Sequence, residues 1–130
     1  METIDARPSD ESLPLGWASL ALADAIKTGD VGAAERCFTP DACLITPDAT
    51  AVSGPLEVRA ILIQLIDAGT VIEVEAGAVV RAGELALSSE RLHFRSRGVP
   101  YRQTFAANMV LRRDGSDWRV AIAAPLGWGG

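Results

Sequence analysis

The chain has 130 residues, of which 48% are hydrophobic and 22% charged, and its formal net charge is -5 at pH 7. This length and composition suit one domain with a hydrophobic core. The acidic balance argues against a nucleic-acid partner, which would require a basic face. No stretch approaches the roughly 20 consecutive apolar residues of a membrane span, so we expect no membrane partner either.

The start of the chain and its two cysteines bear on location. Residues 1–12 are polar and lack the apolar run of a signal peptide. We therefore expect a flexible N-terminal segment over 1–12 and a single domain over 13–130. Cys37 and Cys43 are too few for a disulfide scaffold. Reduced thiols in a cytoplasmic protein are the simplest interpretation.

Two helices are predicted at the start of the domain. Leu15–Lys27 is rich in Ala and Leu and contains no Pro, which favours a helix. Asp30 is placed to cap a second, short helix over Val31–Phe38. We expect Thr39-Pro40-Asp41 to end this second helix.

A short hairpin and a third helix follow. Ala42–Thr46 and Ala51–Ser53 are aliphatic and β-branched stretches that predict two paired strands. Gly54-Pro55 then opens a helix that ends at Gly69, because Pro is accepted at the first helical position. Its apolar residues recur with a helical period and form one core-facing stripe: Val58, Ile61, Leu62, Leu65 and Ile66. This helix is expected to be the main cover of the sheet.

The last part of the chain predicts long antiparallel strands. Apolar and polar residues alternate there, which is typical of half-buried strands, and the short turns favour pairing between neighbours. The expected strands are Val71–Ala82, Leu85–Arg97, Tyr101–Arg113 and Asp117–Ala124. The final strand is apolar on both faces, with Trp118, Val120 and Ile122 on one and Ala121 and Ala123 on the other. A second copy of the chain is therefore expected to cover the outer face of the sheet.

This order of elements predicts an α+β fold, and several short motifs add a family resemblance. They are Gly29-Asp30 with Ala33-Ala34 and Phe38, Thr39-Pro40-Asp41-Ala42, Gly54 with Val58-Arg59, and Asp114-Gly115-Ser116-Asp117-Trp118-Arg119-Val120. In this order they resemble the nuclear transport factor 2-like superfamily, and within it the ketosteroid isomerase-like and SnoaL-like polyketide cyclase branch, over about residues 15–128. The resemblance implies a cystatin-like α+β roll, in which a cone-shaped, curved antiparallel sheet wraps around three N-terminal helices. It also implies a deep apolar cavity and a homodimer through the outer sheet face.

The same resemblance argues against steroid isomerase activity. The isomerases have a carboxylate base just before a Pro at the end of the first short strand, where this chain has Thr46 before Pro47. The positions matching their oxyanion hole are about Leu22 and Met109, which donate no useful hydrogen bond. The fold is therefore expected to be shared without that chemistry.

Strand phase nominates the residues that would line the cavity. If Ala86, Leu92 and Phe94 face inward, Ser88 and Glu90 do so as well. An apolar wall disfavours the charged form of a carboxylate, which suits Glu90 as a general acid or base. Two alternatives stay open: a bulge turns Glu90 outward, or it pairs with Arg91, Arg102 or Arg112. The predicted pocket comprises Trp17, Leu22, Phe38, Thr46, Leu62, Ile66, Ser88, Glu90, Leu92, Tyr101, Gln103, Phe105 and Met109.

Other candidate sites are weaker. His93 is the only histidine, and by strand phase it lies on the outer face among arginines, where a surface or interface role is expected. We expect no metal site, since no cluster of His, Cys and carboxylate residues supplies ligands. We also expect no nucleotide cofactor, because no Gly-rich phosphate loop precedes a helix.

Three functions are compatible with these observations. The first is a small-molecule-binding protein with an apolar cone pocket and a small apolar or cyclic ligand. The second is an isomerase, cyclase, dehydratase or hydrolase that acts on a cyclic or polyketide-like ligand, with Glu90 as general base and Gln103 or Tyr101 orienting the substrate. The third is a dimerisation module whose pocket is filled by side chains.

Overall fold

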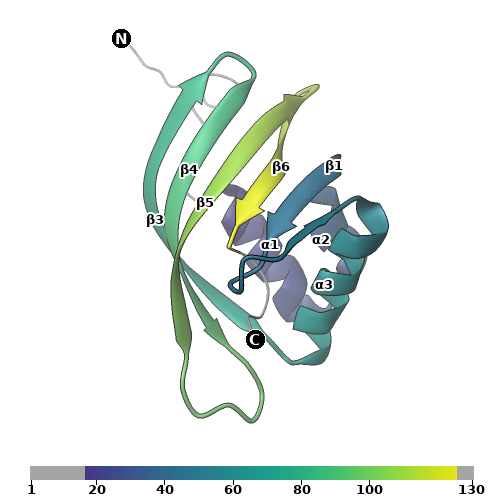
Figure 1. Cartoon of the computed structure of the whole chain (residues 1–130), viewed down its shortest axis with the longest axis vertical. Coiled ribbons are helices and arrows are strands. Elements are labelled where there is room, and N and C mark those ends of the chain that lie inside the picture. Colours follow the sequence, from purple (N-terminus) through teal and green to yellow (C-terminus); the bar gives the residue numbers. More distant parts are fainter. Residues whose placement is uncertain (1–16, 126–130) are drawn as a thin grey trace.

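The computed structural model describes residues 17–125, with the exception of the Trp17 side chain. Three helices and a six-stranded sheet follow one another along the chain. They are α1 (Trp17–Thr28), α2 (Val31–Arg36), β1 (Phe38–Ile45), β2 (Ala51–Ser53), α3 (Pro55–Asp67), β3 (Val71–Ala82), β4 (Leu85–Arg95), β5 (Gln103–Asp114) and β6 (Asp117–Ala124). The sheet curves strongly, and the helices lie on its concave side (Figure 1). The predicted α+β fold is thus confirmed.

The strand order in the sheet is β2-β1-β6-β5-β4-β3. Neighbouring strands pair antiparallel except β1 and β6, which run parallel. The sheet is therefore mixed, whereas the sequence predicted an antiparallel one. Helix α3 carries the chain from the β1–β2 edge to β3 at the opposite edge (Figure 1).

The first strand is longer than predicted, and the second helix is shorter. The helix α2 ends at Arg36, and Thr39-Pro40-Asp41, which was expected to end a helix, lies inside β1. Phe38 pairs with Val120 of β6, and the register then shifts before Cys43. This irregular stretch accommodates Pro40, because a residue without a backbone N–H cannot complete a regular ladder.

The loop between β4 and β5 begins earlier and ends later than predicted. Strand β4 stops at Arg95, because the backbone N–H of Arg97 donates to the carbonyl of Ala68 just after α3 instead, at 3.0 Å. Strand β5 begins at Gln103, so Tyr101 lies in the loop. The predicted bounds of β2, β3 and β6 are confirmed.

A bulge changes which side chains of β6 face the core. The register between β5 and β6 shifts at Val110 and Leu111, which leaves Ala121 as an extra residue on β6. Trp118, Val120, Ala121 and Ala123 are consequently buried, while Ile122 is 41% exposed. The prediction that Ile122 shares the face of Trp118 and Val120 was wrong, because simple alternation does not survive an inserted residue.

The core lies between the helices and the concave face of the sheet. Val58, Leu62 and Leu65 of α3 are buried as the predicted stripe required, and Ile61 and Ile66 pack against the same cluster. Helix α1 contacts β3, and α2 lies against α1 and α3. Within the described residues, no helix has the length and apolar character needed to cross a membrane.

Candidate functional site: a buried carboxylate on the concave face

The inner face of β4 carries Glu90 into the interior. Alternate residues of this strand are buried as predicted: Ala86, Ser88, Glu90, Leu92 and Phe94. Glu90 is only 7% exposed, although carboxylates are rarely buried without a charged partner. The alternative in which a bulge turns Glu90 outward is therefore wrong.

Two serine hydroxyls donate to the Glu90 carboxylate. Ser88, two residues earlier on β4, donates to Oε2 at 2.7 Å. Ser19 of α1 donates to Oε1, and its oxygen also lies 3.2 Å from the sulfur of Met109. Both serines are buried, so the carboxylate and its donors form a polar cluster inside the core.

The arginines that might have paired with Glu90 are engaged elsewhere. Nη1 of Arg102 lies 3.3 Å from Oε1 of Glu73, and Nη1 of Arg112 lies 3.1 Å from Oδ1 of Asp41. Arg91 is exposed on the opposite face of β4. In the described part of the chain, Glu90 therefore has neutral hydrogen-bond donors and no ion-pair partner.

Ser19 was missed by the sequence analysis. It lies on the buried side of α1 together with Leu22 and Ile26, at a helical spacing of three and seven residues. A serine within an otherwise apolar stripe was the available signal. What the spacing could not show is that this stripe lies against Glu90, 71 residues further along the chain.

The Glu90 carboxylate can accept further hydrogen bonds. An ionised carboxylate offers about four acceptor positions, of which the two serines occupy one on each oxygen. Glu90 can therefore accept a hydrogen bond from a ligand hydroxyl or amine, or act as a general base on an acidic C–H or O–H.

Most of the other predicted pocket residues belong to the packed core. Buried or partly buried members of this core are Leu22, Phe38, Leu62, Ile66, Leu92, Phe105 and Met109. Gln103 is half-buried, and its amide oxygen is buried without a hydrogen-bond donor in the described part of the chain. Tyr101 is 63% exposed, and the Trp17 side chain lies outside the described residues.

Thr46 serves the turn between β1 and β2. Its hydroxyl donates to the carboxylate of Asp48 and accepts from the backbone N–H of Thr50 at 3.2 Å. The Thr46 hydroxyl, and then hydrogen bonds from Thr50 to the Asp48 carboxylate, hold the pKa of Asp48 below its ordinary value. Thr46 is buried, yet its polar atom is committed to this turn.

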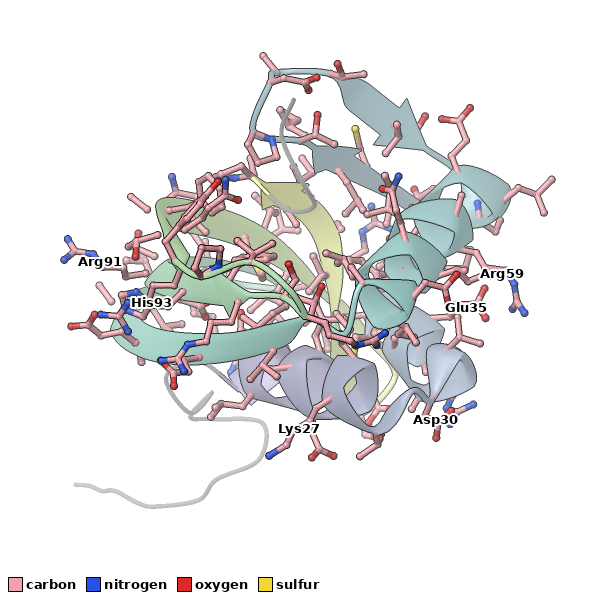
Figure 2. The ribbon with its side chains drawn as sticks, turned by 90° about the horizontal axis from the view of Figure 1, so that it is seen from below. Lys27, Asp30, Glu35, Arg59, Arg91 and His93 are labelled. Atoms are coloured by element: carbon pink, nitrogen blue, oxygen red, sulfur yellow. The ribbon has the colours of Figure 1, made fainter. Side chains whose placement is uncertain are left out.

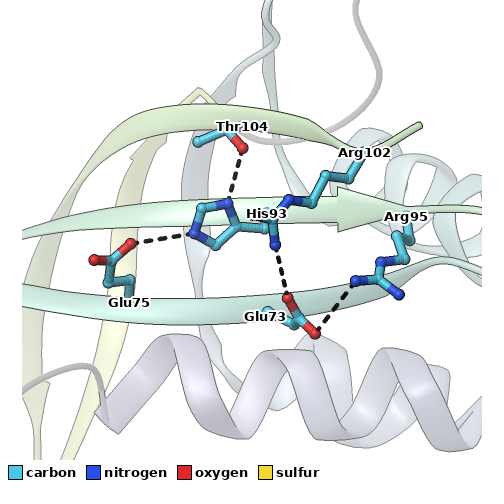
Figure 3. Close-up of polar contacts among 6 residues, drawn as sticks. All are labelled: Glu73, Glu75, His93, Arg95, Arg102 and Thr104. Atoms are coloured by element: carbon cyan, nitrogen blue, oxygen red, sulfur yellow. Dashed lines mark hydrogen bonds and ion pairs between the residues drawn. The ribbon is translucent and has the colours of Figure 1, made fainter.

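The outer face of the same strands carries a second polar cluster (Figure 3). His93 contacts Thr104 through Nδ1 at 2.8 Å and Glu75 through Nε2 at 3.2 Å. Beside it, the Glu73 carboxylate forms two ion pairs: Oε1 lies 3.3 Å from Nη1 of Arg102, and Oε2 lies 3.8 Å from Nη2 of Arg95. The prediction that His93 lies on the outer face is confirmed. Among the described residues, no group of three or more His, Cys, Asp and Glu is arranged to hold a metal ion.

Comparisons with known proteins agree with this architecture. The SnoaL-like domain family matches residues 20–120. No curated protein matches the chain significantly.

Solved structures share the fold at low sequence identity. A domain of unknown function with a cystatin-like fold from Nostoc punctiforme PCC 73102 has a TM-score of 0.70 and 21% identity, covering 82% of this chain and 70% of that one. A ketosteroid isomerase-like protein from Erwinia carotovora atroseptica has a TM-score of 0.66 and 18% identity, covering 84% and 89%. An epoxide hydrolase of M. tuberculosis, described as LEH-like, has a TM-score of 0.61 and 17% identity, covering 82% and 77%. With most of its length matched, the chain belongs to the SnoaL-like family of the nuclear transport factor 2-like superfamily.

Proposed function

We propose that this protein binds a small, largely apolar molecule on the concave side of the sheet, with Glu90 as its polar anchor. The observation that carries the proposal is the buried Glu90 carboxylate, which has two serine donors and no charged partner in the described part of the chain. The surrounding side chains, such as Leu92 and Met109, are apolar. Such a setting suits a ligand with an apolar body and one hydrogen-bond donor.

Folding alone gives little reason for a carboxylate at this position. Removing a carboxylate from water costs several kcal/mol even after the protein relaxes. A hydrogen bond to a charged group returns roughly 1.5 to 3 kcal/mol. An apolar side chain would fill the same space without that cost, so a role toward a ligand is the better account of Glu90.

A pair of probe molecules tests this role. 1-Naphthol offers an apolar body and a hydroxyl donor, whereas 1-methoxynaphthalene keeps the body and loses the donor. We expect the wild-type protein to bind 1-naphthol about tenfold more tightly, the ratio that roughly 1.4 kcal/mol of a charge-assisted hydrogen bond produces. Fluorescence titration of the naphthalene ring measures both affinities.

Two variants test whether Glu90 causes the tighter binding of 1-naphthol. Glu90→Gln should remove the preference for 1-naphthol, because an amide is a weaker acceptor than a carboxylate. Glu75→Gln is the matched control, since Glu75 is an exposed carboxylate on the outer face of the neighbouring strand β3. Equal affinities for the two probes in the wild type, or the same loss in Glu75→Gln, would refute the proposal.

A second candidate function is catalysis with Glu90 as general base on a cyclic or polyketide-like substrate. The 2.7 Å bond from Ser88 favours it, because it holds the carboxylate in one orientation, as a base requires. Incubation with a ligand that the protein retains separates the two functions. Turnover that disappears in Glu90→Gln supports catalysis, whereas a ligand recovered chemically unchanged supports binding alone.

A homodimer through the outer sheet face is part of the proposal. Across four strands, the cross-strand partners Val80, Leu87, Val110 and Ile122 form an aliphatic row on that face. Val80 is 63% exposed and Leu87 44%, which a second copy would cover. Native mass spectrometry measures the oligomeric state and any retained small molecule together.

A cytoplasmic location remains a prediction, and it agrees with the free thiols of Cys37 and Cys43.

A further inference from the structure

A cleft lies on the helical side of the molecule, away from Glu90. It has a volume of about 360 Å³ and opens between α2, the start of β1 and the beginning of α3. Glu35 of α2 and Arg59 of α3 mark this side in Figure 2, opposite Arg91 and His93. The residues that decide its chemistry are Arg36, Arg119, Glu35, Phe38, Pro55 and Val58. Apart from Phe38, none of them belongs to the proposed concave site.

Arg119 lines this cleft, and part of its guanidinium group is buried beside it. Its Nε is buried and has no acceptor among the residues that the structure describes. The carboxylate of Asp114 lies 3.6 Å from Nε, which is close enough for electrostatic attraction but too long for a hydrogen bond. Arg119 lines the cleft, so its guanidinium charge is placed to attract an anionic oxygen there, since guanidinium groups pair well with carboxylate and phosphate oxygens.

Arg36 supplies a second guanidinium group at the same place. Its Nη1 lies 3.4 Å from the position that a Cβ atom on Gly32 would occupy, so this side chain lies back along α2 at the cleft. Burial raises the pKa of the Cys37 thiol, and the charges of Arg36 and Arg119 both oppose that rise. The two positive charges therefore act on one point at the junction of α2 and β1.

The acidic residue of the cleft does not cancel these charges. Glu35 is paired with Arg59 at 2.7 Å, a contact that lies at the exposed edge. Thr39 also lines the cleft, and its hydroxyl donates to Asp41 at 2.8 Å. The apolar part of the wall includes Phe38 and Val58, which are nearly fully buried, and Pro55. The cleft thus combines two guanidinium groups with an apolar surface, on a chain whose formal net charge is -5.

We infer that this cleft binds a small organic oxyanion, a carboxylate or a phosphate ester, that carries a compact apolar body. The guanidinium groups of Arg36 and Arg119 contact the oxyanion, since planar guanidinium groups pair well with carboxylate and phosphate oxygens. The apolar body lies against Phe38, Pro55 and Val58. This site is independent of the concave site proposed above.

Three probes test the inference by NMR titration of the full-length, isotope-labelled protein. Benzoate and phenyl phosphate carry the two oxyanions on the same ring, and benzyl alcohol carries the ring without a charge. We expect saturable shifts of the Gly32, Thr39 and Arg119 amides, with benzyl alcohol bound roughly tenfold or more weakly than the better anion. The ratio between benzoate and phenyl phosphate identifies which oxyanion the cleft prefers.

Charge-removing variants decide whether the two arginines are responsible. Arg36→Gln is expected to lower the affinity for the more tightly bound anion about tenfold. Because Arg36 is exposed, this variant should keep its fold. Arg119→Gln should lower the same affinity to a similar extent. Arg91→Gln, an exposed arginine on the opposite side of the molecule, is the matched control (Figure 2). Equal binding of benzyl alcohol, shifts that map to Ser88 and Glu90, or an equal loss in Arg91→Gln would overturn the inference.

Discussion

The two faces of β4 hold ionisable side chains in opposite settings. On the inner face, Glu90 is buried and receives hydrogen bonds from two neutral hydroxyls. On the outer face, His93 contacts Glu75, and salt bridges of Glu73 with Arg95 and Arg102 lie beside it (Figure 3). Solvent screens the charges of Glu73, Arg95 and Arg102, which pair with one another, so ordinary surface electrostatics accounts for them. It does not account for Glu90, and this difference is why the inner face marks the candidate site.

The largest expected difference between the faces is in packing. Phe94 is fully buried on the inner face and packs edge-to-face on Phe105, with ring centroids 5.5 Å apart. Phe94→Ala should lower the free energy of unfolding by about 3 to 5 kcal/mol. Leu87→Ala, on the outer face of the same strand, should change it by about 0.5 kcal/mol or less in a monomer. Urea denaturation measures both values.

The same pair of variants also tests whether a second copy of the chain covers the outer face. If Leu87→Ala costs as much as Phe94→Ala, the outer face is buried by a second copy of the chain. In that case the unfolding midpoint should rise with protein concentration, because association stabilises the folded state. A large loss that does not depend on concentration would contradict both the monomer and the dimer accounts.

A smaller effect should separate the hydroxyls on the two faces. Ser19→Ala leaves one oxygen of the buried Glu90 without its donor, which should cost about 1 to 3 kcal/mol in the free energy of unfolding. Ser89→Ala is the matched control, because Ser89 donates to Asn108 on the exposed outer face, where about 0.5 kcal/mol or less is expected. Equal losses would mean that Glu90 does not depend on its inner donors.

The smallest expected effect is on the stability of the fold at acid pH. It tests Asp41, a carboxylate on the solvent side. The hydroxyl of Thr39, and then Arg112, hold the pKa of Asp41 below its ordinary value. A lowered pKa contributes stability above the unfolded value of about 4, and this contribution is lost as the pH falls through the folded value. The difference in unfolding free energy between wild type and Asp41→Asn should therefore shrink below about pH 4. Urea denaturation from pH 3 to 7 measures it, and a difference that grows in acid would contradict the assignment.

Local patterns in the sequence predicted much of the fold. The alternation in β4 placed Glu90 on the inner face, because side chains on a regular strand point to opposite sides in turn. The apolar period of α3 identified its buried stripe, with Val58, Leu62 and Leu65. In both cases the deciding information lies within one element.

The features that escaped prediction depend on contacts between elements. The Ser19 hydroxyl reaches Glu90 only because α1 packs against the sheet, and no pattern within either segment shows that contact. The exposure of Ile122 results from the bulge between β5 and β6, which adds a residue without a clear sequence signal. The cleft with Arg36 and Arg119 was missed for the same reason, since these residues come from opposite ends of the domain.

The parallel pairing of β1 with β6 has a consequence for how the chain folds. The carbonyl of Cys37 accepts from the N–H of Val120 at 2.7 Å, and Leu44 pairs with Ala123. Contacts between residues so distant in sequence form slowly, because a long loop must close before they contribute. During synthesis, the apolar side chains of β1 must wait until β6 has left the ribosome. The nascent chain should therefore be most prone to aggregation, and most dependent on chaperones, until that strand emerges.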